Sequence, residues 1–174
     1  PFMQVLSQTF NTAIANIQAT ITVFMIALAL SNFITTPLAD YFGRRKILLF
    51  GLITACCGTL LLLIPSLPSF ILGRIFQGVG AATGLSLSRV IIRDISRDEA
   101  HLAKMYSIYS TILCITPAAS PLIGAYIQHH LGWQAVFILL ASLYVLHISC
   151  VSRYFKETMR QEELATTRPS KLLA

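Results

Sequence analysis

The hydrophobic positions of this 174-residue chain form long continuous runs, separated by short clusters of charged positions. Charged residues are absent from residues 1–39, 47–73 and 105–152. Because a helix rises about 1.5 Å per residue, roughly 20 apolar residues cross a bilayer. The last run is long enough for two crossings and a turn. The pattern predicts an all-α integral membrane protein, since one signal peptide would supply only a single short run.

Prolines and charge clusters divide these runs into five predicted spanning helices. They cover about residues 17–37, 47–64, 69–92, 105–128 and 133–155. Pro65 and Pro68 end the second helix, and glycines are frequent in the third. Residues 1–158 would form a partial helix bundle, and residues 159–174 would begin a polar cytoplasmic loop.

Composition agrees with a membrane location. Only 11% of the residues are charged, 55% are hydrophobic, and the mean hydropathy is +0.71. Soluble domains carry about 25% charged residues. The net charge of +6 lies in three basic clusters, within residues 44–46, 89–104 and 153–171. The intervening turns, at residues 65–69 and 128–134, contain no Lys or Arg.

This alternation is the positive-inside pattern of membrane proteins. The basic clusters would face the cytoplasm and anionic lipid head groups, so the expected partner is the bilayer and not a nucleic acid. Helices one, three and five would then run from outside to inside. Because the count is odd and the chain begins with Pro1, we expect another spanning helix to precede residue 1.

The most specific short pattern is Thr-Pro-Leu-Ala-Asp-Tyr-Phe-Gly-Arg-Arg-Lys, at residues 36–46. Gly43 permits a sharp turn between two helices. The carboxylate of Asp40 can pair with a guanidinium group or with a helix N-terminus. A generic positively charged loop is the alternative interpretation.

A second pattern, Arg-Ile-Phe-Gln-Gly-Val-Gly-Ala-Ala, begins at Arg74 inside the third predicted helix. An Arg within a span costs several kcal/mol, so it should face protein or water and have a partner. No acidic residue lies in the apolar runs. Gly80 and Gly84 form a small-xxx-small pattern that allows close helix approach. Alternatively, Arg74 extends to the outer interface.

A third pattern, Thr-Pro-Ala-Ala-Ser-Pro-Leu-Ile-Gly, covers residues 116–124. Pro117 and Pro121 remove two intrahelical hydrogen bonds and should bend the fourth helix. A kinked helix with a purely structural role is the alternative.

The three patterns resemble motifs of the major facilitator superfamily, most closely its bicyclomycin-resistance type of drug:proton antiporter. The first resembles the loop between helices two and three, the second the R-x-x-Q-G-x-G-A-A motif of helix four. The third resembles the A-P-x-x-x-P-x-x-G form of helix five. The resemblance aligns this chain with helices two to six. It implies that helix one, with an Asp, and the C-terminal half are missing.

The resemblance also implies roles for particular residues. The substrate and proton path would comprise Arg74, Gln77 and Asn32. The cytoplasmic gate would comprise Asp40, Gly43, Arg44, Arg45 and Arg93. Helix packing and bending would rest on Gly78, Gly80, Gly84, Pro117, Pro121 and Gly124.

The implied function is proton-coupled efflux of small amphiphilic, drug-like compounds across a bacterial cytoplasmic membrane, with this fragment inactive alone. One alternative is a non-transporting membrane remnant or scaffold. Another is a carrier of a different small metabolite from the same superfamily.

Enzymatic chemistry is not expected from this sequence. An intramembrane enzyme needs a nucleophile–base pair or a metal pair inside the spans, and no such spacing occurs. The adjacent His129 and His130 are weak evidence for a metal. The four cysteines are predicted to be small buried side chains. We therefore predict no catalytic residues, no metal and no cofactor.

Overall fold

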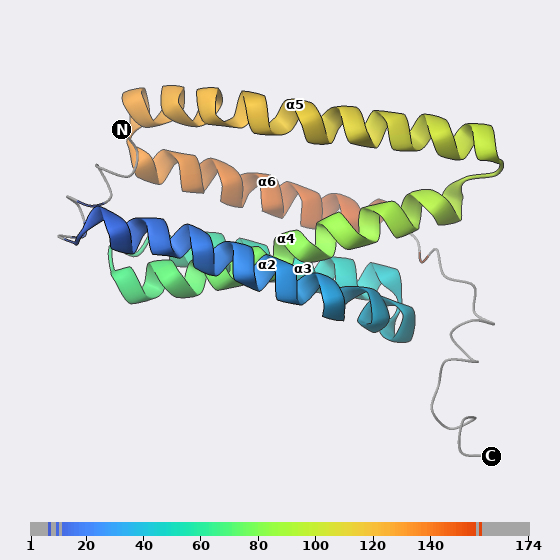
Figure 1. Ribbon diagram of the computed structural model, residues 1–174, viewed down its shortest axis with the longest axis horizontal. Helices are drawn as coiled ribbons and strands as arrows, with labels where there is room; N and C mark the ends of the chain where they lie inside the picture. The colour runs from blue at the N-terminus through green and yellow to red at the C-terminus, as the bar shows by residue number, and fades with distance from the viewer. Residues whose placement is uncertain (1–6, 8–9, 11, 156, 158–174) are drawn as a thin grey trace, which may run out of the picture.

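The computed structural model describes residues 7, 10, 12–155 and 157. This part of the chain forms five α-helices that lie lengthwise beside one another (Figure 1). They are α2 (Ile14–Phe42), α3 (Arg44–Leu61), α4 (Leu67–Ile95), α5 (Glu99–Leu131) and α6 (Trp133–Tyr154). The predicted cytoplasmic loop, residues 159–174, lies outside the described residues.

Three of the helices, α2, α4 and α5, extend at both ends beyond the ranges predicted for them. α2 continues through Pro37 to Phe42, and α5 begins at Glu99 and not near residue 105. At the start of α5, Asp98 caps the helix by accepting a hydrogen bond from the backbone N–H of His101 at 2.7 Å. A hydropathy pattern detects only the apolar part of a helix. It therefore misses the polar turns at the helix ends.

The predicted all-α membrane fold is confirmed. Within the described residues, α2, α4, α5 and α6 are long and apolar enough to cross a membrane. The second predicted span, residues 47–64, corresponds to α3, which has 18 residues and begins with Arg-Arg-Lys. Three of its 18 residues are therefore charged.

Glycines set the close packing of α4 against its neighbours. A Cβ added to Gly58 of α3 would lie 2.7 Å from the carbonyl oxygen of Gly73 on α4, and the converse distance is also 2.7 Å. A Cβ on Gly78 would lie 2.7 Å from the carbonyl oxygen of Phe24 on α2. At these crossings only glycine permits such close backbone approach.

The predicted packing glycines divide into two groups. Gly78 and Gly80 lie at close contacts, and Gly80 faces the backbone of Gly51 on α3. By contrast, a Cβ at Gly84 or Gly124 would meet no atom within 4 Å. The second small residue of the predicted Gly80–Gly84 pair therefore faces open space in the described part of the bundle.

α5 lies along one side of the bundle and contains no buried residue among those described. Pro117 and Pro121 lie inside it, and Figure 1 shows α5 as one continuous helix. Large apolar side chains are exposed on this and other helices, including Leu122 at 74% and Phe33 at 80%. Such extensive apolar exposure suits contact with lipid or with further membrane helices.

The cysteines lie on several faces of the bundle. Cys56 is buried, whereas Cys57, Cys114 and Cys150 are exposed. The prediction of buried cysteines is therefore wrong for three of the four. The reason is that an apolar residue in a membrane helix can face lipid as well as the core.

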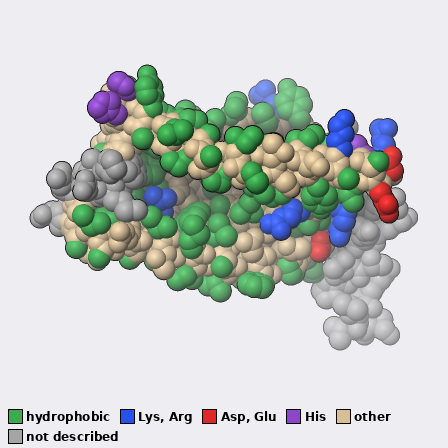
Figure 2. Space-filling model, turned by 45° about the horizontal axis from the view of Figure 1, so that its top comes forward, with side chains coloured by type: hydrophobic (Ala, Val, Ile, Leu, Met, Phe, Trp, Pro, Cys, Tyr) green, Lys and Arg blue, Asp and Glu red, His purple; other side chains and the backbone are tan. Residues whose placement is uncertain are grey.

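Charge divides the bundle into two ends. The charged end contains the α2–α3 turn, the α4–α5 turn and the end of α6; the far end contains the α3–α4 and α5–α6 turns. Figure 2 shows the acidic side chains with many of the basic ones toward one end, and a pair of histidines at the other. This arrangement follows from the alternation of charge clusters along the sequence.

Candidate functional site

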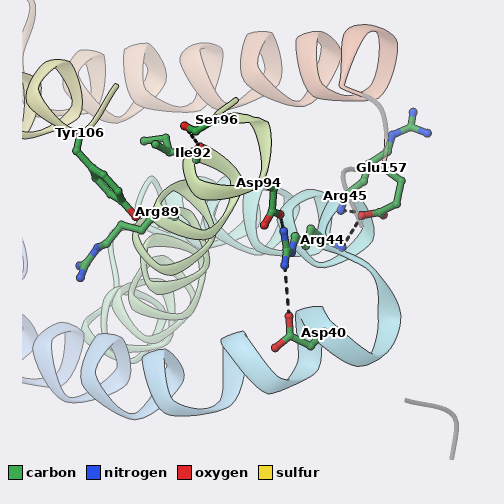
Figure 3. A network of polar contacts seen from close by, with 9 residues as sticks. All are labelled: Asp40, Arg44, Arg45, Arg89, Ile92, Asp94, Ser96, Tyr106 and Glu157. Carbon is green, nitrogen blue, oxygen red and sulfur yellow. Dashed lines mark hydrogen bonds and ion pairs between the residues drawn. The ribbon is translucent and has the colours of Figure 1, made fainter. Parts of the chain in front are cut away.

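A buried guanidinium group lies at the centre of the charged end. Arg44, the first residue of α3, is only 5% exposed. Its side chain forms an ion pair with Asp94 near the end of α4, and its Nη2 lies 3.9 Å from a carboxylate oxygen of Asp40 on α2 (Figure 3). A buried charge is costly unless it is paired, so these carboxylates offset the burial of Arg44.

Glu157, which follows α6, caps the start of α3 from a distant part of the sequence. Its carboxylate accepts hydrogen bonds from the backbone N–H groups of Arg44, at 3.0 Å, and Arg45, at 3.2 Å (Figure 3). Free N–H groups and the helix dipole favour a carboxylate at this position. The guanidinium of Arg45 also donates to the carbonyl oxygen of Ser152 at 2.6 Å.

Gly43 makes this cap possible in two ways. Its φ of +95° lies in the region that favours glycine. A Cβ at this position would also lie 2.8 Å from Oε2 of Glu157. The residue therefore forms the turn between α2 and α3 and leaves room for the carboxylate.

The predicted gate residues are mostly brought together. Asp40, Gly43, Arg44 and Arg45 lie in one network, whereas the structure gives Arg93 no ion pair or hydrogen bond with a described residue. The neighbouring Asp94 faces Arg44 instead. Asp94 and Glu157 were not among the predicted site residues. The sequence could have indicated these two residues, because each is an acidic residue at the end of an apolar helix.

A second polar cluster lies within the membrane-spanning part of α4. Arg74 donates from Nη1 to Oε1 of Gln77 at 3.2 Å, and Nε2 of Gln77 donates to Oγ1 of Thr59 on α3 at 2.9 Å. Thr59 in turn donates to the carbonyl oxygen of Ala55 at 2.8 Å. The predicted pair of Arg74 and Gln77 is thus in contact, and a threonine that was not predicted joins it.

Aromatic rings surround the same guanidinium group. The Cζ of Arg74 lies 5.3 Å from the ring centroid of Phe70 and 6.0 Å from that of Phe137, within range of cation–π attraction. Phe10 and Trp133 extend this aromatic cluster toward the far end. Phe70 lies four residues before Arg74 on the same helix, so that contact is local. The contacts from α6 and from the segment before α2 have no local signal in the sequence.

Asn32 belongs to a different contact. Its Oδ1 accepts a hydrogen bond from the hydroxyl of Ser86 at 2.5 Å, which joins α2 to α4. Ser86 lies more than three helical turns beyond Arg74, about 18 Å along the axis of α4. The structure therefore does not bring Asn32 to the pair of Arg74 and Gln77, although all three face helix neighbours.

The structure thus defines a helical membrane protein with a cation inside α4 and a charged turn between α2 and α3. The sequence matches the Major Facilitator Superfamily over residues 1–173, and the chain belongs to this family. Members of this family are generally transporters and not enzymes. The chain is accordingly a multi-pass membrane protein.

Several curated relatives are named as drug-resistance proteins. The chain is 31% identical to a chloramphenicol resistance protein of Pseudomonas aeruginosa, over 99% of this chain and 41% of that protein. It is 31% identical to a bicyclomycin resistance protein homolog of Haemophilus influenzae, over 84% of this chain and 37% of that protein. It is 28% identical to the multidrug resistance protein MdtL of Salmonella paratyphi B, over 89% of this chain and 39% of that protein.

These matches confirm the predicted resemblance to the drug-resistance members of the superfamily. The chain spans about two fifths of the length of these curated relatives. The matches support multidrug efflux at the level of the family.

Proposed function

We propose that this chain is part of a proton-coupled exporter of small amphiphilic compounds in a bacterial cytoplasmic membrane. The observation that carries the proposal is Arg74, a charged residue in the apolar part of α4 that contacts Gln77 and two aromatic rings. A charge inside a membrane costs several kcal/mol and is a hypothesis of function by default. The drug-resistance relatives support the class of substrate.

Arg74 supplies a fixed positive charge that can couple protons to substrate. A guanidinium stays protonated at all physiological pH values, so it does not itself carry the proton. It favours the ionised form of any carboxyl group that approaches it. In the complete protein, such a group would lose its attraction to Arg74 when protonated, and a substrate would compete for the same cation. Gln77 would hold the guanidinium in place, and Asn32 would line the path nearer the charged end.

The network at the charged end would act as a cytoplasmic gate. Asp40, Arg44, Arg45, Asp94 and Glu157 join the α2–α3 turn to α4 and to the segment after α6. Alternating access by rocking of helix bundles requires contacts that hold one state and break in the other. Arg93, exposed beside Asp94, is the predicted gate residue with the least support.

The exposed proline-containing helix would provide the flexibility. Pro117 and Pro121 each remove a backbone donor from α5, which lowers the cost of bending that helix. The open space at Gly124 leaves room for such a movement or for a further helix.

Efflux from everted membrane vesicles tests the proposal. The complete protein that contains this chain is expected to export a panel of amphiphilic dyes and antibiotics when a proton gradient is imposed, and to stop when a protonophore collapses it. Residues 1–174 expressed alone are expected to export nothing, because alternating access requires two bundles that move against each other. Transport of a nutrient but no drug would favour the metabolite carrier, and no transport of any compound would favour the scaffold.

The orientation is tested by cysteine labelling in a variant without the four native cysteines. His130→Cys, at the far end, is expected to react with a membrane-impermeant thiol reagent added outside intact cells. Arg97→Cys, at the charged end, is expected to react only after the membrane is opened, because basic clusters remain in the cytoplasm. Both positions are exposed, so accessibility within the fold does not bias the comparison. The reverse labelling pattern would contradict the proposed orientation.

A further inference from the structure

We propose that Thr59 of α3 is a positioning residue for Arg74, and that it acts through the side-chain amide of Gln77. The inference rests on the proposed function, because it assumes that Arg74 takes part in export. Thr59 is fully buried and Gln77 is 6% exposed. Their hydrogen bond, at 2.9 Å, links α3 to the side chain that contacts the guanidinium.

The crossing of two helices places Thr59 opposite Gln77. Gly58 precedes Thr59, and Gly73 precedes Arg74; these two glycines meet where α3 crosses α4. A Cβ at Gly58 would lie 2.7 Å from the carbonyl oxygen of Gly73 and 2.9 Å from the backbone nitrogen of Gln77. Because the backbones are this close, a short threonine side chain reaches the glutamine without an intervening water.

The hydroxyl of Thr59 fixes the direction of the whole chain of hydrogen bonds. Its proton is donated to the carbonyl oxygen of Ala55 at 2.8 Å, so its oxygen can only accept from Gln77. The NH2 group of Gln77 must then face Thr59, and the amide oxygen must face Arg74. The chain runs from guanidinium to amide to hydroxyl to backbone carbonyl, and each bond polarises the next.

This direction matters because of what else contacts Arg74. The rings of Phe70 and Phe137 attract the guanidinium by their faces but do not accept a strong, directed hydrogen bond. Oε1 of Gln77 is the oxygen acceptor that the described residues supply. Without the hydroxyl of Thr59, the amide could rotate by half a turn and present N–H groups to a cation. Arg74 would then lose its directed partner and adopt several orientations.

The amide itself provides the first test, which does not depend on transport. We expect the side-chain NH2 signal of Gln77, in the 15N-glutamine-labelled chain in lipid nanodiscs, to exchange slowly with solvent. The signal is assigned by its loss in Gln77→Leu. Thr59→Val keeps the shape but removes the hydroxyl, and should speed the exchange about tenfold, the effect of losing one hydrogen bond.

Two variants provide the controls. Thr59→Ser retains the hydroxyl and should retain slow exchange. Thr54→Val makes the same change on the same helix and should leave Gln77 unaffected. Among the described residues, the hydroxyl of Thr54 bonds only the carbonyl oxygen of Phe50. Equal exchange in Thr59→Val and Thr54→Val would overturn the proposed contact.

The second test measures proton-driven efflux by the complete protein across a range of pH. Thr59→Val should lower kcat/KM about tenfold and shift the pH at which efflux is half-maximal, since the position of Arg74 sets the ionisation of groups near it. Thr59→Ser and Thr54→Val should keep the original pH profile. An unchanged profile in Thr59→Val, with Arg74→Ala inactive, would overturn the positioning role. Full export by Arg74→Ala would instead contradict the proposed function. The exchange measurement would then still test the contact between Thr59 and Gln77.

Discussion

Replacing Arg74 by alanine is expected to abolish proton-driven export by the complete protein, at least a hundredfold, while membrane insertion continues. The guanidinium lies in the membrane-spanning part of α4, 3.2 Å from Gln77 and over two aromatic rings. Alanine removes the fixed charge, and the apolar helix that remains inserts at least as well. Efflux from vesicles and the amount of inserted protein, measured on the same preparation, check both parts.

Two further variants separate the charge from its geometry. Arg74→Lys keeps a positive charge but lacks the planar group that contacts Gln77 and the rings, so it should restore little activity. Arg89→Ala is the control, because it also removes a charge from α4, at the charged end. In the described contacts Arg89 contributes only its backbone carbonyl, to Tyr106, and alanine keeps that carbonyl. Normal export by Arg74→Ala would contradict this role. It would favour the alternative in which Arg74 only extends to the outer interface.

The sequence predicted what local patterns can encode. Gaps between charged residues are sufficient to place α2 and the pair α5 and α6, because a membrane helix is mostly apolar along its span. α4 contains Arg74, so it was predicted from the prolines before it and the basic cluster at its end. Arg74 and Gln77 are three residues apart, and such residues are neighbours on a helix. Asp40 and Arg44 lie on either side of a glycine turn, so their proximity is also local.

Contacts between distant segments escaped the sequence analysis. Thr59 meets Gln77 only because two glycines let α3 and α4 cross closely, and Glu157 meets the start of α3 only through the three-dimensional arrangement of α6. Asp94, next to the predicted Arg93, was not predicted as a partner of Arg44 for a related reason. Successive helix residues point about 100° apart, and the sequence does not give the rotation of α4 relative to Arg44.

The charged end carries the second large expected effect. Arg44→Ala should lower the free energy of unfolding by about 3–5 kcal/mol, because it leaves the Asp94 carboxylate without its cation. The two side chains are 6% and 17% exposed, so solvent compensates little. Asp40 is the weaker partner, since its side chain is 47% exposed and the distance is 3.9 Å. Unfolding of the chain in mixed micelles by titration with SDS, followed by circular dichroism, measures the change.

The matched comparison uses the neighbouring cation and the double variant. Arg93→Ala removes an exposed charge one residue from Asp94 and should change the unfolding free energy by less than about 0.5 kcal/mol. Arg44→Ala combined with Asp94→Ala should destabilise less than Arg44→Ala alone, because the Asp94 carboxylate is then not left without its cation. If the double variant instead lost as much as the sum of the two single variants, the pair would be energetically independent. Arg44 would then stabilise the chain through its packing and its bonds to Glu157, and the gate would have to operate without the contact between α3 and α4.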